Sequence, residues 1–382
     1  MRVVLLAALF ALTILPGCGT DNPEPSLQPT AAPDSVSVVR EARGFSLEWS
    51  DGHRRLTVWD PERRGEPLAR YQLVPRGEVL LANPVRATYR LAVPVQRLVV
   101  LSTSHLGIID RIGHSDAVVG IAQSQFVYDA AVRARIADGA IVDVGQESAL
   151  NIEQLVALQP DAVMFSNWQD PSGVAERLRA AGIVPIYNLE WMETTPLGRT
   201  EWMVAVGALL GVEAAARATF DSIAAAYNAT AEAVRTPGRR PTVLTGSNYQ
   251  GTWYVPGGNS FMGQFLRDAG ADYHWAEDNS RGSIALSFEA ILDTHIDADI
   301  WINPGAAPSL EWLADADPRY ARFKAFREGA VYNNNARLAP GGGNDYWESG
   351  VAAPHRILAD LAAILHPERF PDHTLHYFQR LR

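Results

Sequence analysis

The sequence predicts an α/β fold in which two related, doubly wound lobes are bridged by a long helix and preceded by a small β-rich extension. Continuous apolar runs that end in small polar residues, such as 97–104, alternate with helical segments. This alternation is typical of parallel strands buried between helices. Residues 151–165 and 287–302 repeat one order of polar cap, glutamate, helix, aspartate and buried strand. Between these repeats, apolar residues recur at helical spacing through 212–235.

Residues 1–17 predict a secretory signal peptide. Arg2 precedes an apolar run, 3–14, that is too short to span a bilayer, and Gly17 stands directly before Cys18, the only cysteine of the sequence. This arrangement resembles the lipobox cut by lipoprotein signal peptidase. We therefore expect an exported chain that starts at Cys18 and is lipid-anchored to a membrane, facing the periplasm or the cell exterior. An ordinary signal peptide with a chance cysteine is the alternative.

The composition narrows the class of protein. A chain of 382 residues with 47% hydrophobic residues suits two globular domains. The formal net charge of −10 argues against nucleic acid as a partner. With a single cysteine, the folded part has no internal disulfide. Residues 18–35 are proline-rich and polar, which is typical of a flexible tether, here a lipidated one.

Changes in periodicity divide the rest of the chain into four segments. Residues 36–96 contain short alternating segments separated by turn residues, which predicts a β-rich extension packed on the first lobe. Residues 97–196 form the N-terminal lobe and residues 237–382 the C-terminal lobe. Residues 197–236 form the interlobe helical segment, whose second helix, 212–235, would be about 35 Å long.

Glu153 and Glu289 occupy equivalent positions in the two repeated segments. Each lies two residues after a predicted helix N-cap, where the helix dipole stabilises a carboxylate by roughly 0.3–1 kcal/mol. That effect alone would explain either glutamate. Their symmetry favours a shared role in docking.

Four motifs carry a family resemblance when taken together. They are the strand and polar turn 99–104, the stretch 143–153, the Leu-Gln-Pro-Asp run 158–161, and the interlobe helix. With these motifs the chain resembles the substrate-binding proteins of ABC importers for iron–siderophore complexes, haem and cobalamin, over roughly 98–371. The resemblance implies two Rossmann-like lobes joined by one rigid helix, with a ligand cleft between them. It also implies a monomeric carrier whose partner is an ABC permease with a cytoplasmic ATPase.

The resemblance assigns the two glutamates a role. Glu153 and Glu289 would project toward the membrane and pair with arginines of the permease, with Glu147 as a less favoured substitute on the first lobe. Exposed charge pairs contribute orientation and association rate more than affinity. This suits a delivery protein, which must also release its partner.

Candidates for ligand binding lie at the carboxyl ends of the predicted strands, where doubly wound folds bind their ligands. Their aromatic side chains suit a large ring-bearing ligand, although sealing of the lobe interface explains any single one equally well. The principal candidates are Ser104, His105, Trp168, Trp191, Tyr249, Trp253, Asn259, Arg281 and Trp347. Further candidates are Asn167, Glu190, Tyr254, the loop 257–260, Asn303 and Tyr346.

Some of these residues have a specific chemistry. Arg281 could clamp a carboxylate or phosphate, although a surface arginine is commoner. His105 could ligate haem iron, although a histidine after a strand more often forms a hydrogen bond or caps a helix. His366, His373 and His376 lie in the C-terminal tail, where we expect them to be solvated.

The expected ligand is a metal chelate, with ferric siderophore and cobalamin nearly level and haem below them. The main alternative is a lipid-anchored α/β hydrolytic enzyme. The sequence has no Gly-x-Ser-x-Gly elbow after a strand, no His-Glu-x-x-His motif and no nucleotide-binding glycine loop. We therefore expect a binding protein without catalytic residues, metal ligands or a cofactor of its own.

Overall fold

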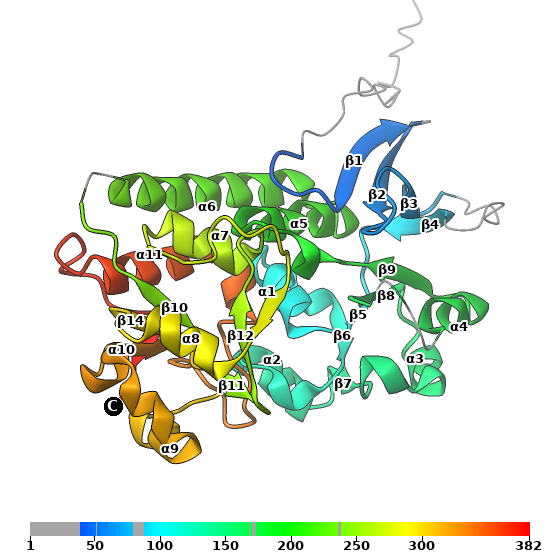
Figure 1. Cartoon of the computed structure of the whole chain (residues 1–382). Coiled ribbons are helices and arrows are strands. Elements are labelled where there is room, and N and C mark those ends of the chain that lie inside the picture. Colours follow the sequence, from blue (N-terminus) through cyan, green and yellow to red (C-terminus); the bar gives the residue numbers. More distant parts are fainter. Residues whose placement is uncertain (1–38, 51, 79–87, 168, 170–172, 236–237) are drawn as a thin grey trace, which may run out of the picture.

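The computed structural model describes residues 39–50, 52–78, 88–167, 169, 173–235 and 238–382. The predicted signal peptide, Cys18 and the predicted tether lie outside these residues. Figure 1 shows two lobes below the long helix α6 (Glu213–Val234), with a small sheet at one side. The predicted fold class, two α/β lobes bridged by a helical segment, is confirmed.

A five-stranded parallel sheet forms the centre of the first lobe. Its spatial order is β7-β6-β5-β8-β9, so the order of the strands reverses between β5 and β8. In doubly wound sheets the carboxyl ends at such a reversal form a crevice. The strands are β5 (Leu98–Val100), β6 (Val118–Ile121), β7 (Val142–Asp143), β8 (Ala162–Phe165) and β9 (Val184–Tyr187). The helices are α1 (Thr103–Arg111), α2 (Ala130–Ala137), α3 (Ile152–Leu158) and α4 (Val174–Ala180).

The second lobe is built from two smaller sheets. In the first, β10, β14 and β15 are parallel and β16 is antiparallel. Its strands are β10 (Val243–Thr245), β14 (Ile300–Ile302), β15 (Val331–Asn333) and β16 (Gln379–Arg380). The second sheet is antiparallel, with β11 (Asn248–Tyr249), β12 (Thr252–Pro256) and β13 (Ser283–Leu286). The helices are α7 (Phe261–Asp268), α8 (Phe288–His295), α9 (Leu310–Ala316), α10 (Lys324–Arg327) and α11 (Pro354–Leu365).

A separate four-stranded sheet precedes the first lobe. It comprises β1 (Phe45–Ser50), β2 (His53–Trp59), β3 (Pro67–Pro75) and β4 (Thr88–Val93), with only the β3–β4 pair parallel. Tyr71 joins this sheet to β9, because its hydroxyl donates to the carbonyl of Pro185 (3.0 Å) and accepts from the amide of Tyr187 (3.1 Å). This contact anchors the sheet to the first lobe.

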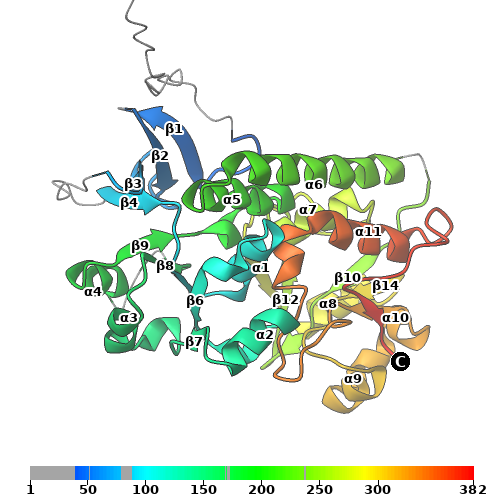
Figure 2. The same ribbon diagram turned by 180° about the vertical axis from the view of Figure 1, so that it is seen from behind.

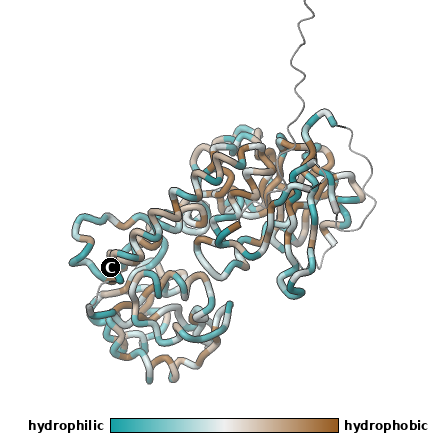
Figure 3. The backbone as a smooth tube through the Cα atoms, turned by 90° about the horizontal axis from the view of Figure 1, so that it is seen from above, coloured by the Kyte–Doolittle hydropathy of each residue, from teal (hydrophilic) through white to brown (hydrophobic). Residues whose placement is uncertain are grey.

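Two consecutive helices connect the lobes. Helix α5 (Pro196–Leu209) begins with a proline after Thr195, whose hydroxyl accepts from the amide of Gly198 (3.0 Å). Gly211, at φ +76°, separates α5 from α6 in the left-handed conformation that glycine adopts without strain. Helix α6 has 22 residues and is about 33 Å long. Seen from above, the chain forms two bodies side by side (Figure 3).

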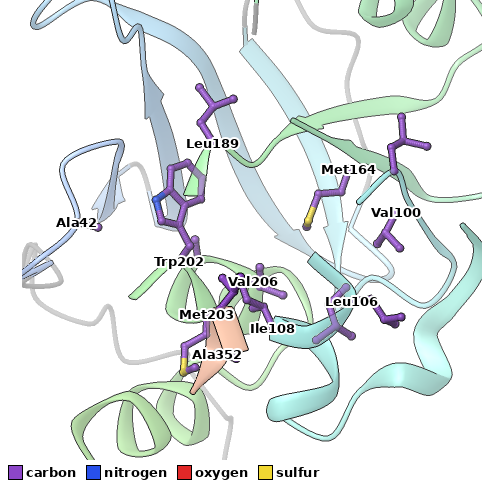
Figure 4. Close-up of a cluster of buried hydrophobic side chains, with 14 of the residues drawn as sticks. Ala42, Val100, Leu106, Ile108, Met164, Leu189, Trp202, Met203, Val206 and Ala352 are labelled. Atoms are coloured by element: carbon purple, nitrogen blue, oxygen red, sulfur yellow. The ribbon is translucent and has the colours of Figure 1, made fainter. Parts of the chain in front are cut away.

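Residues 348–352, which we call the crossing segment, return from the second lobe to pack on the first lobe. Gly107 of α1 lies so close to it that a Cβ there would stand 2.0 Å from the carbonyl oxygen of Glu348. Helix α11 then runs beneath α6, as both ribbon views show (Figures 1 and 2). Buried side chains of α1, α5 and the crossing segment share one core, which includes Ile108, Met203 and Ala352 (Figure 4). The lobes are therefore joined by the crossing segment as well as by the helices.

Candidate ligand-binding site

The candidate site is a cavity of about 740 Å³ in the second lobe. Thr245 ends β10 and Gly246 follows it, Asn303 follows β14, and Asn333 ends β15, so three parallel strands direct their carboxyl ends into it. The remaining walls come from β12, the start of α7, the segment 281–283 and the loop 338–347. The placement agrees with the rule that open α/β sheets bind ligands at strand carboxyl ends.

The loop 338–347 also reaches the first lobe. A Cβ at Gly341 would lie 2.2 Å from the carbonyl oxygen of Gln125, and a Cβ at Gly343 would lie 2.3 Å from that of Phe126. Only glycine allows backbones to approach so closely. The wall of the cavity is thus in direct contact with the 3₁₀ helix Ser124–Phe126 of the first lobe.

Asparagine side chains hold the loops around the cavity. The amide of Asn333 donates to the carbonyls of Gly305 (3.0 Å) and Ala307 (2.8 Å), and that of Asn344 donates to the carbonyl of Asn334 (3.1 Å). Asn303 differs, because its side-chain oxygen is buried and accepts no hydrogen bond from a described residue. A buried polar atom without a partner is costly, and this unsatisfied acceptor belongs to a residue of the cavity wall.

Aromatic side chains form the apolar part of the wall. Trp347 is 47% exposed, and its ring stands edge-on to Tyr346, with the centroids 4.7 Å apart. Tyr346 is buried, and burial raises the pKa of its phenol above the usual value. Tyr254 of β12 and Phe261 of α7 also line the cavity. The Arg199 guanidinium lies over the ring of Phe261, 4.4 Å from its centroid. These rings offer flat apolar surface to a large ligand.

The structure brings together only part of the sequence-predicted site. Arg281 and Trp347 of the principal candidates line the cavity, as do the further candidates Tyr254, Asn303 and Tyr346. Asn259 lines a neighbouring cavity, which also includes Arg281. Trp168 lies outside the described residues.

Two principal candidates have no exposed side-chain surface. The ring of His105 is buried in the first lobe, where Nε2 lies 3.2 Å from the carbonyl oxygen of Asn188, and burial lowers its pKa. Trp253 is buried in the second lobe, stacks on Trp301 and donates from Nε1 to the carbonyl of Thr245 (2.8 Å). The structure therefore places both in the core, and Trp253 supports a cavity residue without facing the cavity.

The other principal candidates are accessible but do not line the cavity. Ser104 lies in the first turn of α1, with its hydroxyl 2.8 Å from that of Ser102. Trp191 is 47% exposed and donates to the carbonyl of Ser166 (3.0 Å). Tyr249, in β11, is 64% exposed. Ser166 directly follows β8 and Trp191 follows β9, so their hydrogen bond lies at the carboxyl ends of these two strands.

The three candidate docking glutamates differ in their surroundings. Glu153 is exposed in the first turn of α3. Glu289 is exposed in the first turn of α8, and one of its oxygens lies 3.7 Å from the Arg319 guanidinium. Glu147 accepts hydrogen bonds from the hydroxyl of Ser166 (3.1 Å) and the amide of Asn167 (2.8 Å). Because these hydrogen bonds occupy the carboxylate of Glu147, Glu153 is the more accessible of the two candidate glutamates in the first lobe.

The C-terminal histidines are less solvated than the sequence suggested. His366 is buried, with Nε2 3.1 Å from the carbonyl oxygen of Ala269, which corrects the expectation. His373 is half-buried, and its Nε2 lies 2.7 Å from the buried carboxylate of Asp360. Within the described ranges, no three His, Cys, Asp or Glu side chains form a group suited to a metal ion.

Sequence reasoning missed the asparagines 333–335 and 344. The available signal was a run of three asparagines directly after the apolar stretch 330–332, because polar residues at the end of a buried strand are a typical binding pattern. The strand is only three residues long. Its short length made it hard to recognise from periodicity.

None of the helices in the described part of the chain is long and apolar enough to cross a membrane.

A family model described as periplasmic binding protein matches residues 98–338. An uncharacterized lipoprotein of Methanocaldococcus jannaschii is 26% identical over 75% of this chain and 69% of its own length. A cobalamin-binding protein of Halobacterium salinarum is 31% identical over 58% of this chain and 57% of its own length.

Solved structures show the same fold. A TroA-like periplasmic binding protein of Veillonella parvula superimposes with a TM-score of 0.56 at 20% identity, over 76% of this chain and 95% of its own. A periplasmic heme binding protein of Pseudomonas aeruginosa gives a TM-score of 0.53 at 22% identity, over 72% and 93%. Because the family model covers most of both lobes, this chain belongs to the periplasmic binding protein family, the substrate-binding components of ABC importers.

Proposed function

We propose that this chain captures a metal chelate in the second-lobe cavity and delivers it to an ABC permease. A corrinoid such as cobalamin is the preferred ligand, ahead of a ferric siderophore and of haem. A lipid on Cys18 would hold the carrier near the permease and keep its effective concentration high without tight contact. The observation that carries the ligand proposal is the chemistry of the cavity wall, which combines aromatic rings and amides with one charged side chain.

The charge of the wall favours a ligand with little net charge. Among the described lining residues, only Arg281 carries a charge. A ferric catecholate complex bears several negative charges and haem bears two propionates, so either would need more cationic partners than the main cavity itself provides once water is excluded. A corrinoid carries neutral amides around a broad ring. Its donors match the free acceptor on Asn303, and its apolar surface matches Trp347 and Tyr254.

Two further observations support this order of ligands. The relative from Halobacterium salinarum is itself called a cobalamin-binding protein. His105, the histidine considered for haem iron, has no exposed surface with which to reach a ligand. A neutral ferric hydroxamate remains the second candidate, because it places the same small demand on charge.

The test is a binding titration of the chain lacking residues 1–18 with cyanocobalamin, a ferric hydroxamate and haemin. We expect cyanocobalamin to bind most tightly, by calorimetry and by its visible absorption band. Trp347→Ala should weaken that binding by about tenfold or more, since loss of one stacked ring costs roughly 1–3 kcal/mol. Trp191→Ala is the matched control, because Trp191 is equally exposed (47%) but lies outside the cavity.

Two outcomes would contradict the proposal. Tight binding of haemin or the hydroxamate with no binding of cyanocobalamin would overturn the order of ligands. Failure to bind all three, together with turnover of an ester or glycoside, would favour the hydrolytic alternative, for which the family match gives no support.

We further propose that Glu153 and Glu289 dock the carrier on arginines of the permease. Both are exposed and each lies in the first turn of a helix that precedes a buried strand of its lobe. Two separate anchors, one on each lobe, would fix the docking angle. Because α5, α6 and the crossing segment join the lobes, we expect lobe movement to be small and release to depend on the permease pulling at both anchors.

A further inference from the structure

A second cavity, of about 590 Å³, lies where the N-terminal sheet and the two lobes meet. Arg43, Trp59 and Arg64 line it from the N-terminal sheet region, Glu193 from the first lobe, and Asn259 and Arg281 from the second lobe. Arg281 also lines the main cavity. One arginine therefore faces both cavities, which makes them neighbouring parts of one site.

The backbone of Arg43 is fixed to the first lobe by Glu193. Both carboxylate oxygens of Glu193 accept from the amide of Arg43 (3.0 Å each), and Oε1 also accepts from the amide of Gly44 (2.8 Å) and from Nε1 of Trp202 (2.9 Å). Gly44 is required here, because a Cβ would lie 2.7 Å from the Trp202 ring. These bonds place the Arg43 side chain at the cavity and at the same time occupy the carboxylate beside it.

The loop between β2 and β3 presents Arg64. Asp60 organises this loop, since its Oδ1 accepts from the amides of Glu62 (2.9 Å) and Arg63 (3.0 Å) and its Oδ2 lies 3.4 Å from Nε of Arg63. The second carboxylate of the cavity is thus also occupied by groups of its own loop. It has little capacity left to pair with Arg64.

Arg281 stands on a backbone segment pinned to the loop 257–259. The amide of Gly257 donates to the carbonyl of Gly282 (2.8 Å), and that of Asn259 donates to the carbonyl of Ser280 (3.1 Å). A Cβ at Gly257 would lie only 2.2 Å from the carbonyl oxygen of Ser280. The close approach of these two backbones fixes where the Arg281 side chain begins.

The side chains of Arg43, Arg64 and Arg281 are exposed, and their guanidinium groups form no hydrogen bond or ion pair within the described part of the chain. Arg43 does interact electrostatically with Glu41, because burial raises the pKa of that carboxyl group and the nearby Arg43 acts against the rise. Arginine guanidinium groups recognise carboxylate and phosphate with paired N–H donors. Three such groups around one cavity, with its two carboxylates already occupied, give an excess of positive charge that a bound anion would neutralise.

We propose that this second cavity is an anion subsite that binds the phosphate substituent of the chelate held in the main cavity. The proposal rests on the proposed function for the chelate itself and adds the N-terminal sheet to the binding machinery. Arg281 contacts both parts of the ligand, and Arg43 and Arg64 contact only its anionic substituent. For a corrinoid, the substituent is the phosphodiester of the nucleotide loop.

The test compares cyanocobalamin, which carries the phosphodiester, with dicyanocobinamide, which lacks it, using the full-length chain in detergent. Replacing both Arg43→Gln and Arg64→Gln should weaken cyanocobalamin binding by about 10- to 100-fold and leave dicyanocobinamide binding unchanged. Millimolar inorganic phosphate should compete with cyanocobalamin only. Arg63→Gln is the matched control, since Arg63 belongs to the same loop but pairs with Asp60.

A second measurement separates failure of this subsite from failure of the proposed ligand. Binding of inorganic phosphate alone, followed by ³¹P NMR, should occur in the wild type and be lost in the double variant, whichever chelate the main cavity takes. Equal loss of both corrinoids in the double variant would mean that the arginines act through the fold, and would overturn the subsite. Absence of phosphate binding by the wild type would overturn it as well.

Discussion

Two pairs of glutamates in this molecule differ in burial, and the difference separates a structural role from a role in recognition. Glu193 and Glu201 are buried and accept hydrogen bonds from the backbone of residues 40–44. Glu153 and Glu289 are exposed in the first turns of helices in the two lobes. The buried pair attaches the segment before the N-terminal sheet to the first lobe and to α5, while the exposed pair is available to an external partner.

The buried pair also differs within itself. Burial raises the pKa of Glu193, and its hydrogen bonds to Gly44, Trp202 and Arg43 do not offset that effect. Burial acts on Glu201 in the same direction, but the amide of Ala42, the guanidinium of Arg217 and the amides of Arg40 and Glu41 together lower its pKa. The ion pair with Arg217 (2.6 Å) is the main difference. A buried carboxylate is held ionised most effectively when backbone amides and a cation act together.

The largest expected effect comes from Glu201→Ala. The substitution leaves the half-buried guanidinium of Arg217 without its carboxylate and three backbone amides without an acceptor. Breaking a buried pair in this way typically costs roughly 3–5 kcal/mol. We expect a loss of that size in the free energy of unfolding, measured by urea denaturation followed by circular dichroism.

The control for that experiment is Glu232→Ala on α6. Glu232 pairs with Arg235 at 3.0 Å, but both side chains are more than two-thirds exposed. Exposed pairs of this kind contribute about 0–1 kcal/mol. If Glu201→Ala cost no more than Glu232→Ala, water would be able to replace the buried carboxylate, and the proposed distinction between the two pairs would fail.

A smaller effect, visible through pH, concerns Glu348 in the segment that crosses between the lobes. Its carboxylate accepts from the amides of Tyr128 (2.7 Å) and Asp129 (2.9 Å), and burial raises its pKa to about 7. The folded state then holds the proton more tightly than the unfolded state, so this stabilisation is full below the unfolded pKa and is lost as pH rises through about 7. Relative to Glu348→Gln, the wild type should lose up to roughly 3 kcal/mol between pH 4.5 and pH 8.

The comparison with the variant isolates this group from the other titrating residues. Asp345 and Asp129 also face Glu348, and both remain in the variant. Glu311→Gln, an exposed substitution in the first turn of α9, should follow the wild type across the whole pH range. A stability difference between wild type and Glu348→Gln that did not change with pH would show that the carboxyl group stays ionised in the fold.

The sequence was informative wherever a local pattern decides the structure. The helix expected over 212–235 is observed as Glu213–Val234, and the buried strand expected at the end of the repeated segment 151–165 is observed as Ala162–Phe165. Both followed from the sequence because apolar periodicity and caps act within a few residues. The position of Glu153 and Glu289 in the first turn of a helix also followed from the local sequence. Such features need no knowledge of the tertiary structure.

The candidate site was less predictable, because it depends on which way neighbouring side chains point. Trp253 and Tyr254 are consecutive in β12, yet the first is buried in the core and the second lines the cavity, since side chains alternate between the two faces of a strand. From the sequence, Trp253 ranked above Tyr254 as a candidate, which is the reverse of what the structure shows. The approach of Arg43 and Arg281 to one cavity depends on contacts between distant segments, which no local pattern encodes.

The smallest effect on stability is expected from replacing the exposed pair. Glu153→Ala together with Glu289→Ala should change the free energy of unfolding by no more than about 0.5 kcal/mol, because exposed side chains away from buried networks contribute little. The affinity for the chelate should also stay unchanged, since neither residue lines either cavity. Uptake of the chelate by cells or vesicles that contain the permease should nevertheless collapse.

The matched control replaces two other exposed glutamates, Glu62 and Glu368, with alanine. It leaves the net charge equal to that of the test variant, so a difference in uptake would reflect the position of the charges and not their number. Full uptake with the Glu153→Ala, Glu289→Ala variant would remove the docking role. Loss of uptake accompanied by a loss of several kcal/mol in the free energy of unfolding would instead show that Glu153 and Glu289 stabilise the fold, as Glu193 and Glu201 do.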